Sequence, residues 1–317
     1  MKDRRSGVAR WIAKFLAEDP PRSKSLVVTL FGDALAPRGG AIWLGDLIGL
    51  LEPFGVNERL TRTSVFRLAE EGWFESRREG RRSLYALTPA GHRRIEHAGR
   101  RIYREPAAGW DGAWTLVLLP RSVGAGEERT ELRKELKWEG FGLVAPGLYA
   151  RPATDTEALD ELLQTLNLRD TVFVMQARQL PGAGRPVREL VDEGWDLGEL
   201  AAGYRAFIAR FQPLRALLRN TVVVDPAEAF MVRALLIHAW RRTVLHDPQM
   251  PAELLPADWP GHRAHELCRE LYVMALDAAE SHLDGAVEGA QGRLPPPAPW
   301  LHARFGGLAL LPGADAA

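Results

Sequence analysis

Cysteine is nearly absent from this sequence, since Cys268 is the only one among 317 residues. A single thiol excludes a disulfide framework and a cysteine-based zinc site, so Cys268 is expected to be a small buried hydrophobic residue. Long apolar runs are missing too, because none approaches the roughly 18 residues of a membrane-spanning helix. The N-terminus, MKDRRSGVAR, lacks the apolar core of a signal peptide. These absences predict a cytoplasmic protein without a membrane partner.

The sequence also lacks the common fingerprints of catalytic sites. It has no Gly-x-Ser-x-Gly elbow, no P-loop and no complete Gly-x-Gly-x-x-Gly after a strand. Histidines gather in the C-terminal part, but without a His-Glu-x-x-His motif or a third ligand in register they are interpreted as scattered core or surface residues. These histidines are His238, His246, His262 and His265. We therefore expect no catalytic residues, no metal and no cofactor.

A net charge is also missing, with 41 basic against 41 acidic residues, but the two signs are unevenly distributed. Residues 1–105 hold 20 Lys and Arg against 13 Asp and Glu, a net charge of +7. Residues 106–317 hold 21 against 28, a net charge of −7. This uneven distribution favours an N-terminal part that binds a polyanion and an acidic C-terminal part that avoids DNA. The alternative is random drift in charge.

Among the features that are present, residues 57–71 form the most informative pattern. The helical spacing places Val65, Leu68 and Ala69 on a buried line and leaves arginines on the exposed side. Gly72 then ends the helix. An exposed helix that carries arginines is how a helix-turn-helix protein presents itself to the major groove of DNA.

A hairpin follows this helix directly. Two short strands are expected at 73–77 and 83–87, joined by the basic turn 78–82. A helix followed by an arginine-tipped hairpin predicts a winged helix-turn-helix module. Two shorter helices, expected at 26–36 and 41–54, complete it.

The candidate DNA contacts follow from these two elements. Guanidinium groups on the helix can pair with guanine, hydroxyl groups near its start can bind a phosphate or a base edge, and arginines of the wing can neutralise phosphates or enter a narrow minor groove. The alternative is a solvated helix face and hairpin tip, with Tyr85 packed inside the wing. The predicted contacts are Arg59, Arg62, Thr63, Ser64, Arg67, Arg77, Arg78, Arg81, Arg82 and Tyr85.

The rest of the chain is read as two further domains. Residues 110–180 follow the order β-α-β-β-α-β, which is the ferredoxin-like pattern. A Pro- and Gly-rich linker at 179–188 leads into long helical segments. The predicted architecture is therefore α+β and multidomain. Its segments are a basic N-terminal arm (1–23), the winged helix with a connecting helix (24–105), the ferredoxin-like domain (110–180) and a mainly α-helical domain for effector binding or dimerisation (190–317).

Several stretches, taken in order, resemble the PaaX family, transcriptional repressors of phenylacetic-acid catabolism. The resemblance covers nearly the whole chain. It is carried by FGDAL, WLGDLIGLLEPFG, TSVFRLAEEGWFESRREGRRSLYALT, AGRRIY, WDGAWTLVLL, GFGLVAPGLYARP and RRTVLHDPQMPAELLPADWPG. It implies a winged helix, a central domain similar to Cas2, and a helical C-terminal domain. It further implies a homodimer on a palindromic operator, released by phenylacetyl-CoA or a related aromatic acyl-CoA.

Such a thioester needs cations for its phosphates and an apolar slot for its acyl group. The C-terminal part supplies both residue types, although each aromatic side chain has core packing as its alternative role. The predicted effector residues are Trp195, Tyr204, Trp240, Arg241, Arg242, Trp259 and Arg263.

The rival hypothesis is a metal-dependent nuclease, since relatives of the Cas2 fold include such enzymes. A nuclease of this type would need an acidic residue at the end of its first strand. That strand ends in Leu118, Leu119, Pro120 and Arg121 without a carboxylate, which favours a role in scaffolding and dimerisation.

Overall fold

The computed structural model describes residues 6–105, 109–120, 126–152, 156–180, 182, 184–221, 223–289 and 292–308. The chain divides into two compact units. Unit 1 combines Met1–Glu105, Ala206–Arg242 and Arg263–Ala317, and unit 2 combines Pro106–Arg205 and Thr243–His262. In the described ranges, no helix is long and apolar enough to cross a bilayer.

Unit 1 begins with α1 (Gly7–Glu18), which Ser6 caps by accepting a hydrogen bond from the backbone N–H of Ala9 at 2.8 Å. Its apolar side places Trp11 and Phe15 against Phe211, with ring centroids 5.3 and 5.8 Å apart. Much of the predicted basic arm therefore forms an amphipathic helix. Residues 1–5 of that arm lie outside the described residues.

The first helix of the winged module changes its hydrogen-bond pattern before it ends. It runs as α2 (Ser23–Leu30), continues as a π-helical turn, η1 (Phe31–Leu35), and finishes in a 3₁₀ turn, η2 (Ala36–Arg38). The π-helical turn carries Asp33, a carboxylate that is only 2% exposed. Turns of this kind are rare and often occur at functional positions, and here one buries a charged group.

The helix predicted at 41–54 is only partly correct. Residues Ala41–Trp43 form a strand, β1, and the helix α3 covers Leu44–Leu51 before a 3₁₀ turn, η3 (Glu52–Phe54). The strand forms because Ile42 and Trp43 pair with Tyr85 and Leu84 of the wing. Periodicity favoured a helix here, and pairing with a distant strand decided otherwise.

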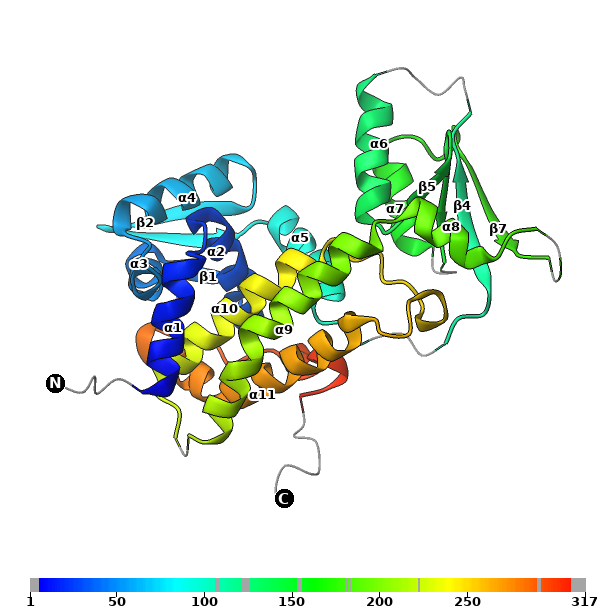
Figure 1. The fold of residues 1–317 in the computed structure, drawn as a ribbon. Coiled ribbons are helices and arrows are strands. Elements are labelled where there is room, and N and C mark those ends of the chain that lie inside the picture. Colours follow the sequence, from blue (N-terminus) through cyan, green and yellow to red (C-terminus); the bar gives the residue numbers. More distant parts are fainter. Residues whose placement is uncertain are drawn as a thin grey trace. The chain divides into compact units, whose positions relative to one another are not determined.

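The helix expected at 57–71 and the wing that follows it lie where they were predicted. They are α4 (Glu58–Glu70), β2 (Phe74–Glu79) and β3 (Arg82–Leu87), followed by α5 (Pro89–Ile102). The sheet has the order β1-β3-β2 and is antiparallel throughout. The strands are longer than expected, so the turn shrinks to Gly80 and Arg81, and Gly80 takes φ +59°. Figure 1 shows α4 beside this sheet.

Three long helices complete the core of unit 1. They are α9 (Leu197–Arg219), α10 (Pro226–Val244) and α11 (Pro260–Ala286), of which residues 206–219, 226–242 and 263–286 belong to this unit. Phe207 of α9 packs on Trp240 of α10, with ring centroids 5.3 Å apart. A short hairpin and two 3₁₀ turns follow: β8 (Glu288–Gly289), β9 (Gly292–Arg293), η5 (Pro299–Leu301) and η6 (Arg304–Gly306).

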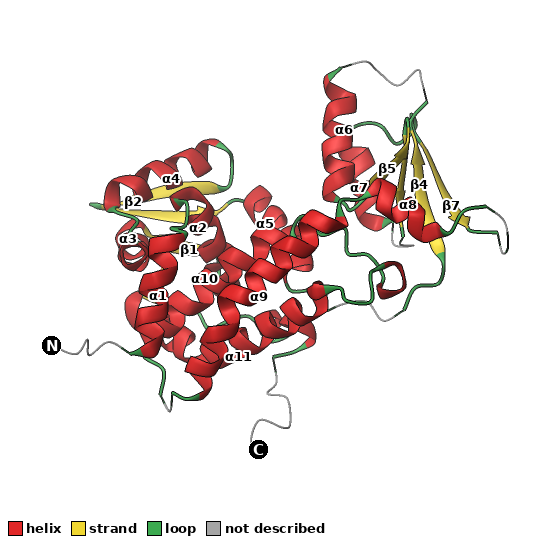
Figure 2. Cartoon of the chain, in the orientation of Figure 1, coloured by secondary structure: helices red, strands yellow, loops and turns green. Residues whose placement is uncertain are grey.

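Unit 2 contains the predicted ferredoxin-like order. Its elements are β4 (Ala113–Leu118), α6 (Glu127–Trp138), β5 (Gly142–Ala145), β6 (Leu148–Arg151), α7 (Glu157–Thr165) and β7 (Phe173–Arg178). The sheet, yellow in Figure 2, has the order β5-β6-β4-β7, and all neighbours are antiparallel. A buried cluster that includes Val117, Leu136 and Leu163 joins it to α6 and α7.

The other side of this sheet is covered as well. Trp114 and Ala150 pack with Val191 of α8 (Val187–Gly194) and with Leu254 of η4 (Ala252–Leu254). Helix α8 begins within the stretch expected to be a linker. The edge strand β7 is different, because most of its side chains are exposed.

Candidate nucleic-acid interface

The position of α4 is set by its first and last turns and by its buried side. The side chain of Asn57 caps the helix by accepting a hydrogen bond from the backbone N–H of Leu60 at 3.0 Å. Val65 and Leu68 are fully buried against the module, and Gly72, with φ +73°, turns the chain toward the wing. These contacts hold the opposite side of α4 toward solvent.

The exposed side of α4 carries four of the five contacts predicted on this helix. Arg59, Arg62, Thr63 and Arg67 are all exposed. Within the described part of the chain, the guanidinium groups of Arg59 and Arg67 form no ion pair. Arg62 pairs with Glu58, one turn earlier, at 2.7 Å, with both side chains more than half exposed. A surface pair of this kind contributes little stability, so a DNA phosphate can replace it at small cost.

Ser64 was predicted to contact DNA, and its burial contradicts that prediction. Its side chain is on the buried side of α4, only 4% exposed, and its hydroxyl donates a hydrogen bond to the hydroxyl of Ser23 at 2.9 Å. This bond joins α4 to the start of α2. Ser64 therefore holds the recognition helix in the module and is not available to DNA.

The wing presents its arginines in three different states. Arg77 pairs with Glu79, and the Nε of Arg78 donates to the carbonyl oxygen of Gly80 at 3.2 Å. Arg81 occupies the tip, is exposed, and has no ion pair to any residue that the structure describes. Arg81 therefore needs no rearrangement to meet a phosphate.

Arg82 and Tyr85 lie further back in β3. The guanidinium of Arg82 donates to Glu288 of β8 at 2.7 Å and lies 4.4 Å from the centroid of the Trp43 ring. Tyr85 is half-buried and lies between Ile42 and Ser76 in the sheet register. A phosphate contact by Arg82 would compete with its ion pair to Glu288.

The segment β8 thus reaches the base of the wing from the far end of the chain. The backbone N–H of Glu288 donates to Asp46 at 3.0 Å, and the indole N–H of Trp43 donates to the carbonyl oxygen of Gly289 at 3.4 Å. Sequence reasoning missed Glu288 as a residue of this region. More than 200 positions separate it from Arg82, and no local pattern indicates their contact.

A buried network of charges joins the winged module to the C-terminal helices within unit 1. The carboxylate of Asp33 accepts from Arg233 of α10 at 2.7 Å and from Arg304 of η6 at 2.9 Å. It also accepts from the hydroxyls of Tyr103 and Tyr272, at 2.7 and 3.0 Å. All four groups are donors, so the carboxylate is fully satisfied as an anion.

The same geometry sets the ionisation of Asp33. Burial by itself raises the pKa of this carboxyl group, but the charges of Arg233 and Arg304 outweigh burial and hold the pKa below its ordinary value. A second layer extends the network, because Glu280 of α11 binds both Arg233 and Arg38, the latter through Nε at 2.7 Å. The winged module and α10–α11 are therefore one ion-paired body.

Comparison with known proteins agrees with this architecture. Three family models match this chain. Residues 22–91 match the model described as PaaX-like protein, and residues 107–191 match the PaaX protein central Cas2-like domain. Residues 195–285 match the PaaX-like protein C-terminal domain. The chain is 42% identical over 295 residues to the transcriptional repressor PaaX of Escherichia coli (strain K12), covering 91% of this chain and 92% of that protein.

The chain belongs to the PaaX family of transcriptional repressors. The resemblance found in the sequence and the predicted three-part α+β architecture are confirmed, as is the prediction that the chain is not an enzyme. The uncharacterized protein Rv0674 from Mycobacterium tuberculosis has the same fold, with a TM-score of 0.53 and 22% identity over 82% of this chain and 97% of that one. The domain boundaries expected from the sequence stay a prediction.

In this PaaX-family chain the predicted effector residues divide between the units. Trp240 is in the core of unit 1, 1% exposed, with its indole N–H donating to the carbonyl oxygen of Ile102 at 2.8 Å. Tyr204 is buried in unit 2 and donates to Asp247. Both residues were predicted to bind the effector, and their burial contradicts that prediction. Buried, hydrogen-bonded side chains of this kind serve packing and are not open to a ligand.

The predicted arginines of the effector set all lie in unit 1. Arg241 donates to the carbonyl oxygen of Ser25 and to Thr29, both at 3.1 Å, and burial lowers its pKa. Arg242 pairs with Asp19 at 3.0 Å and is largely exposed, and Arg263 is exposed. Arg241 is therefore a structural tie between α10 and α2, whereas Arg242 and Arg263 can still meet a phosphate.

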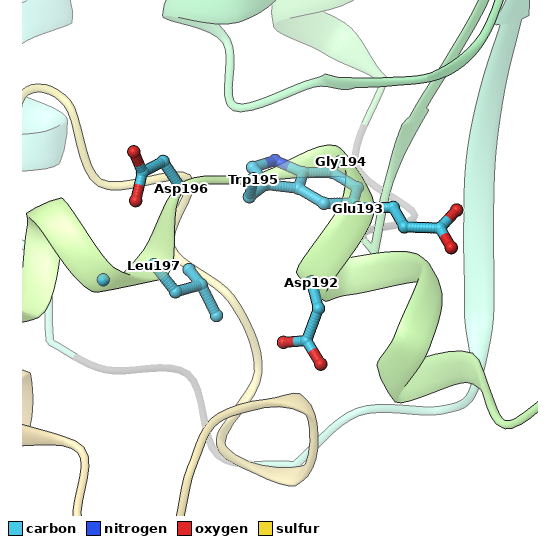
Figure 3. Close-up of a pocket in the computed structure, with 7 residues that line it drawn as sticks. Asp192, Glu193, Gly194, Trp195, Asp196 and Leu197 are labelled. Atoms are coloured by element: carbon cyan, nitrogen blue, oxygen red, sulfur yellow. The ribbon is translucent and has the colours of Figure 1, made fainter.

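Trp195 and Trp259 belong to unit 2. Trp195 donates to the carbonyl oxygen of Gly140 at 3.0 Å and lines an open pocket of about 380 Å³ (Figure 3). The other charged groups of this pocket are the carboxylates of Asp192, Glu193 and Asp196. Their charge repels the phosphates of an acyl-CoA, so this pocket does not suit the anionic end of that ligand.

Two of the four histidines considered as metal ligands have other contacts. His238 lies within hydrogen-bond distance of Thr29 at 3.2 Å, and His265 lies 2.8 Å from the carbonyl oxygen of Arg104. Over the described ranges, no group of three metal-binding side chains comes together.

Proposed function

We propose that this repressor binds operator DNA through α4 in the major groove and the β2–β3 wing on the flanking backbone. One observation carries the proposal. Four exposed arginines, Arg59, Arg67, Arg78 and Arg81, project from these two elements without an ion pair in the described structure. Arginine can pair with guanine in the major groove and can neutralise phosphate along the backbone.

We expect that removing two of these arginines separates the roles of helix and wing. Arg67→Ala is expected to weaken binding by about 1–3 kcal/mol if the side chain reads a base, with the largest loss on the preferred sequence. Arg81→Ala is expected to weaken binding to all sequences and to lower the slope of log affinity against log salt by about one. The measurement is fluorescence anisotropy with labelled duplexes at several salt concentrations.

A matched control removes an arginine at the C-terminal end of α9. Arg219 is more than half exposed and pairs with Glu270. Arg219→Ala should leave the affinity and the salt slope unchanged. If Arg67→Ala and Arg81→Ala behave like this control, the assigned DNA face is wrong.

The proposal includes a homodimer assembled through the edge strand β7. Phe173, Val174 and Met175 on this strand are 58%, 43% and 43% exposed. An exposed apolar strand at the edge of a sheet is a surface that proteins normally cover, and a second copy of the chain is the occupant proposed here. Two winged helices then match the two halves of a palindromic operator.

Met175→Lys is expected to weaken dimerisation at least about tenfold, because burying an unpaired charge in an apolar contact is costly. Sedimentation velocity measures the change. Leu143→Lys is the matched control, since Leu143 is an exposed apolar residue on β5, the opposite edge of the same sheet. Dissociation by Leu143→Lys instead of Met175→Lys would place the dimer contact on the other edge.

The effector proposed is phenylacetyl-CoA or a related aromatic acyl-CoA. Support for this class is the resemblance of the sequence to repressors of phenylacetic-acid catabolism. Of the predicted effector residues, Trp195, Arg242, Trp259 and Arg263 retain partly or fully exposed side chains. Release requires that the thioester bind more tightly to the arrangement that cannot bind DNA.

A gel-shift assay on the upstream region of the protein's own gene tests the function as a whole. A specific complex is expected without ligand, and phenylacetyl-CoA is expected to abolish it. Free coenzyme A and phenylacetate are the controls, and neither alone should release the DNA. A complex that survives the thioester contradicts the effector assignment, and the absence of any sequence-specific complex contradicts the operator-binding role.

A further inference from the structure

The outward face of α4 carries an aromatic side chain that the charge pattern leaves unexplained. Phe66 is 60% exposed, which makes it the most exposed aromatic side chain in the described part of the chain. The buried side of α4 is already filled by Thr61, Val65 and Leu68. Phe66 is thus outside the core of the module, although an aromatic ring gains most from removal from water.

The neighbours of Phe66 on the helix surface are the predicted DNA contacts. With about 100° of rotation per residue, Arg62 lies on one side of Phe66 and Arg67 on the other, and Thr63 adjoins it one turn earlier. The hydroxyl of Thr63 donates to the carbonyl oxygen of Arg59 at 2.9 Å, so this side chain contributes a methyl group and an acceptor oxygen to the surface. Glu70, also exposed, ends this face one turn later.

The centre of this face is therefore apolar, arginines lie on both sides of it, and the carboxylate of Glu70 closes its C-terminal end. A partner that matches it must offer an apolar group between anionic groups. The C5-methyl group of thymine in the major groove has this chemistry, because it projects from the base edges between the two phosphate backbones. An apolar protein partner is a poorer match, since it gives the flanking arginines no anions.

We propose that Phe66 is a specificity-determining residue of the repressor, which contacts the methyl group of a thymine in each operator half-site. The inference rests on the proposed DNA-binding function and deepens it. Arg62 and Arg67 position the helix through polar contacts, and Phe66 distinguishes thymine from cytosine and from uracil by the presence of the methyl group.

The test removes that methyl group without changing the protein. The wild-type chain first selects its preferred duplex from a random-sequence library. Each thymine of that duplex is then replaced in turn by deoxyuridine, which keeps base pairing and lacks only the C5-methyl group. At one position per half-site, the affinity measured by fluorescence anisotropy is expected to fall about fourfold, the effect of one methyl group buried in a contact.

Variants of α4 are then measured on the same thymine and deoxyuridine duplexes. Phe66→Ala should bind the thymine duplex more weakly than wild type and should show no further loss with deoxyuridine at that position, whereas Phe66→Leu should retain part of the methyl effect. Leu60→Ala is the matched control, because Leu60 is an exposed apolar residue on the flank of the same helix. It should keep the full deoxyuridine effect. Circular dichroism should show unchanged folding, since Phe66 is outside the core.

The outcomes separate the inference from the function on which it rests. Selection of no sequence by the wild-type chain overturns the proposed function and this inference with it. Selection of a sequence whose affinity is indifferent to every deoxyuridine overturns the inference alone. An equal deoxyuridine effect in Phe66→Ala and wild type also overturns it, and shows that another residue reads the methyl group.

Discussion

Replacing Asp33 with asparagine is expected to destabilise unit 1 by about 3–5 kcal/mol, the usual cost of removing one partner from a buried ion pair. The carboxylate is 2% exposed and neutralises Arg233 and Arg304, which are 1% and 4% exposed. The amide keeps the shape of the side chain but not its charge. Two buried guanidinium groups then lack a full counterion, and Glu280 compensates only Arg233.

Urea unfolding followed by far-UV circular dichroism measures this loss. Glu18→Gln is the matched control in the same unit, because Glu18 is exposed and its pair with Lys14 spans 3.7 Å on the surface of α1. That variant should change the free energy of unfolding by less than about 0.5 kcal/mol. Equal stability of Asp33→Asn and Glu18→Gln would show that the network contributes specificity of packing and no net stability.

Acidification is expected to cost about 3 kcal/mol of stability through His238 alone. Burial, assisted by the positive charges of Arg241 and Arg242, lowers the pKa of His238 from 6.5 to about 4. Below pH 6.5 this histidine is protonated in the unfolded chain, whereas in the folded chain it stays neutral until about pH 4. The contribution of neutral His238 to the free energy of unfolding is therefore fully present above pH 6.5. It is lost as the pH falls from 6.5 to 4.

The measurement is the free energy of unfolding as a function of pH in wild type and in His238→Gln. Glutamine can retain a hydrogen bond to Thr29 and cannot titrate, so the variant should lose much of the slope between pH 6.5 and 4. Burial also lowers the pKa of His265 and of His282, which leaves a residual slope. His302→Gln, at an exposed position, should keep the wild-type profile. An unchanged slope in His238→Gln would assign the acid sensitivity to other groups.

Two sets of contacts hold the winged module within unit 1. One is the Asp33 network, and the other is the contact of Arg82 and Trp43 with β8. Each joins a residue of the winged module to residues more than 190 positions later. The module is consequently part of a body that includes α10 and α11, and is not a separate head on a linker.

Local patterns were sufficient for the elements of the interface. Helix α4 was predictable because its cap at Asn57, its buried Val65 and Leu68 and its stop at Gly72 are close in sequence. The wing and the order of strands in unit 2 were predictable for the same reason, since turn residues and short apolar runs mark them. Family resemblance then identified the class of protein that these elements compose.

The same patterns failed where a distant partner decides the role of a residue. Ser64 has a typical DNA-contacting side chain, but its place beside Ser23 removes it from solvent. Residues 41–43 fit a helix until β3 pairs with them, and Trp240 fits a ligand pocket until Ile102 accepts its hydrogen bond. Phe66 was overlooked because an apolar residue in a helix is expected to be buried.

Capping residues, periodicity and charge along this chain thus determine which helices and strands form and which of them carries arginines. Only the tertiary structure decides which of those arginines are unpaired, which hydroxyls are buried, and which charges neutralise one another. The reason is physical. Capping and periodicity act within a few residues, whereas ion pairing and burial depend on groups that folding brings together from opposite ends of the sequence.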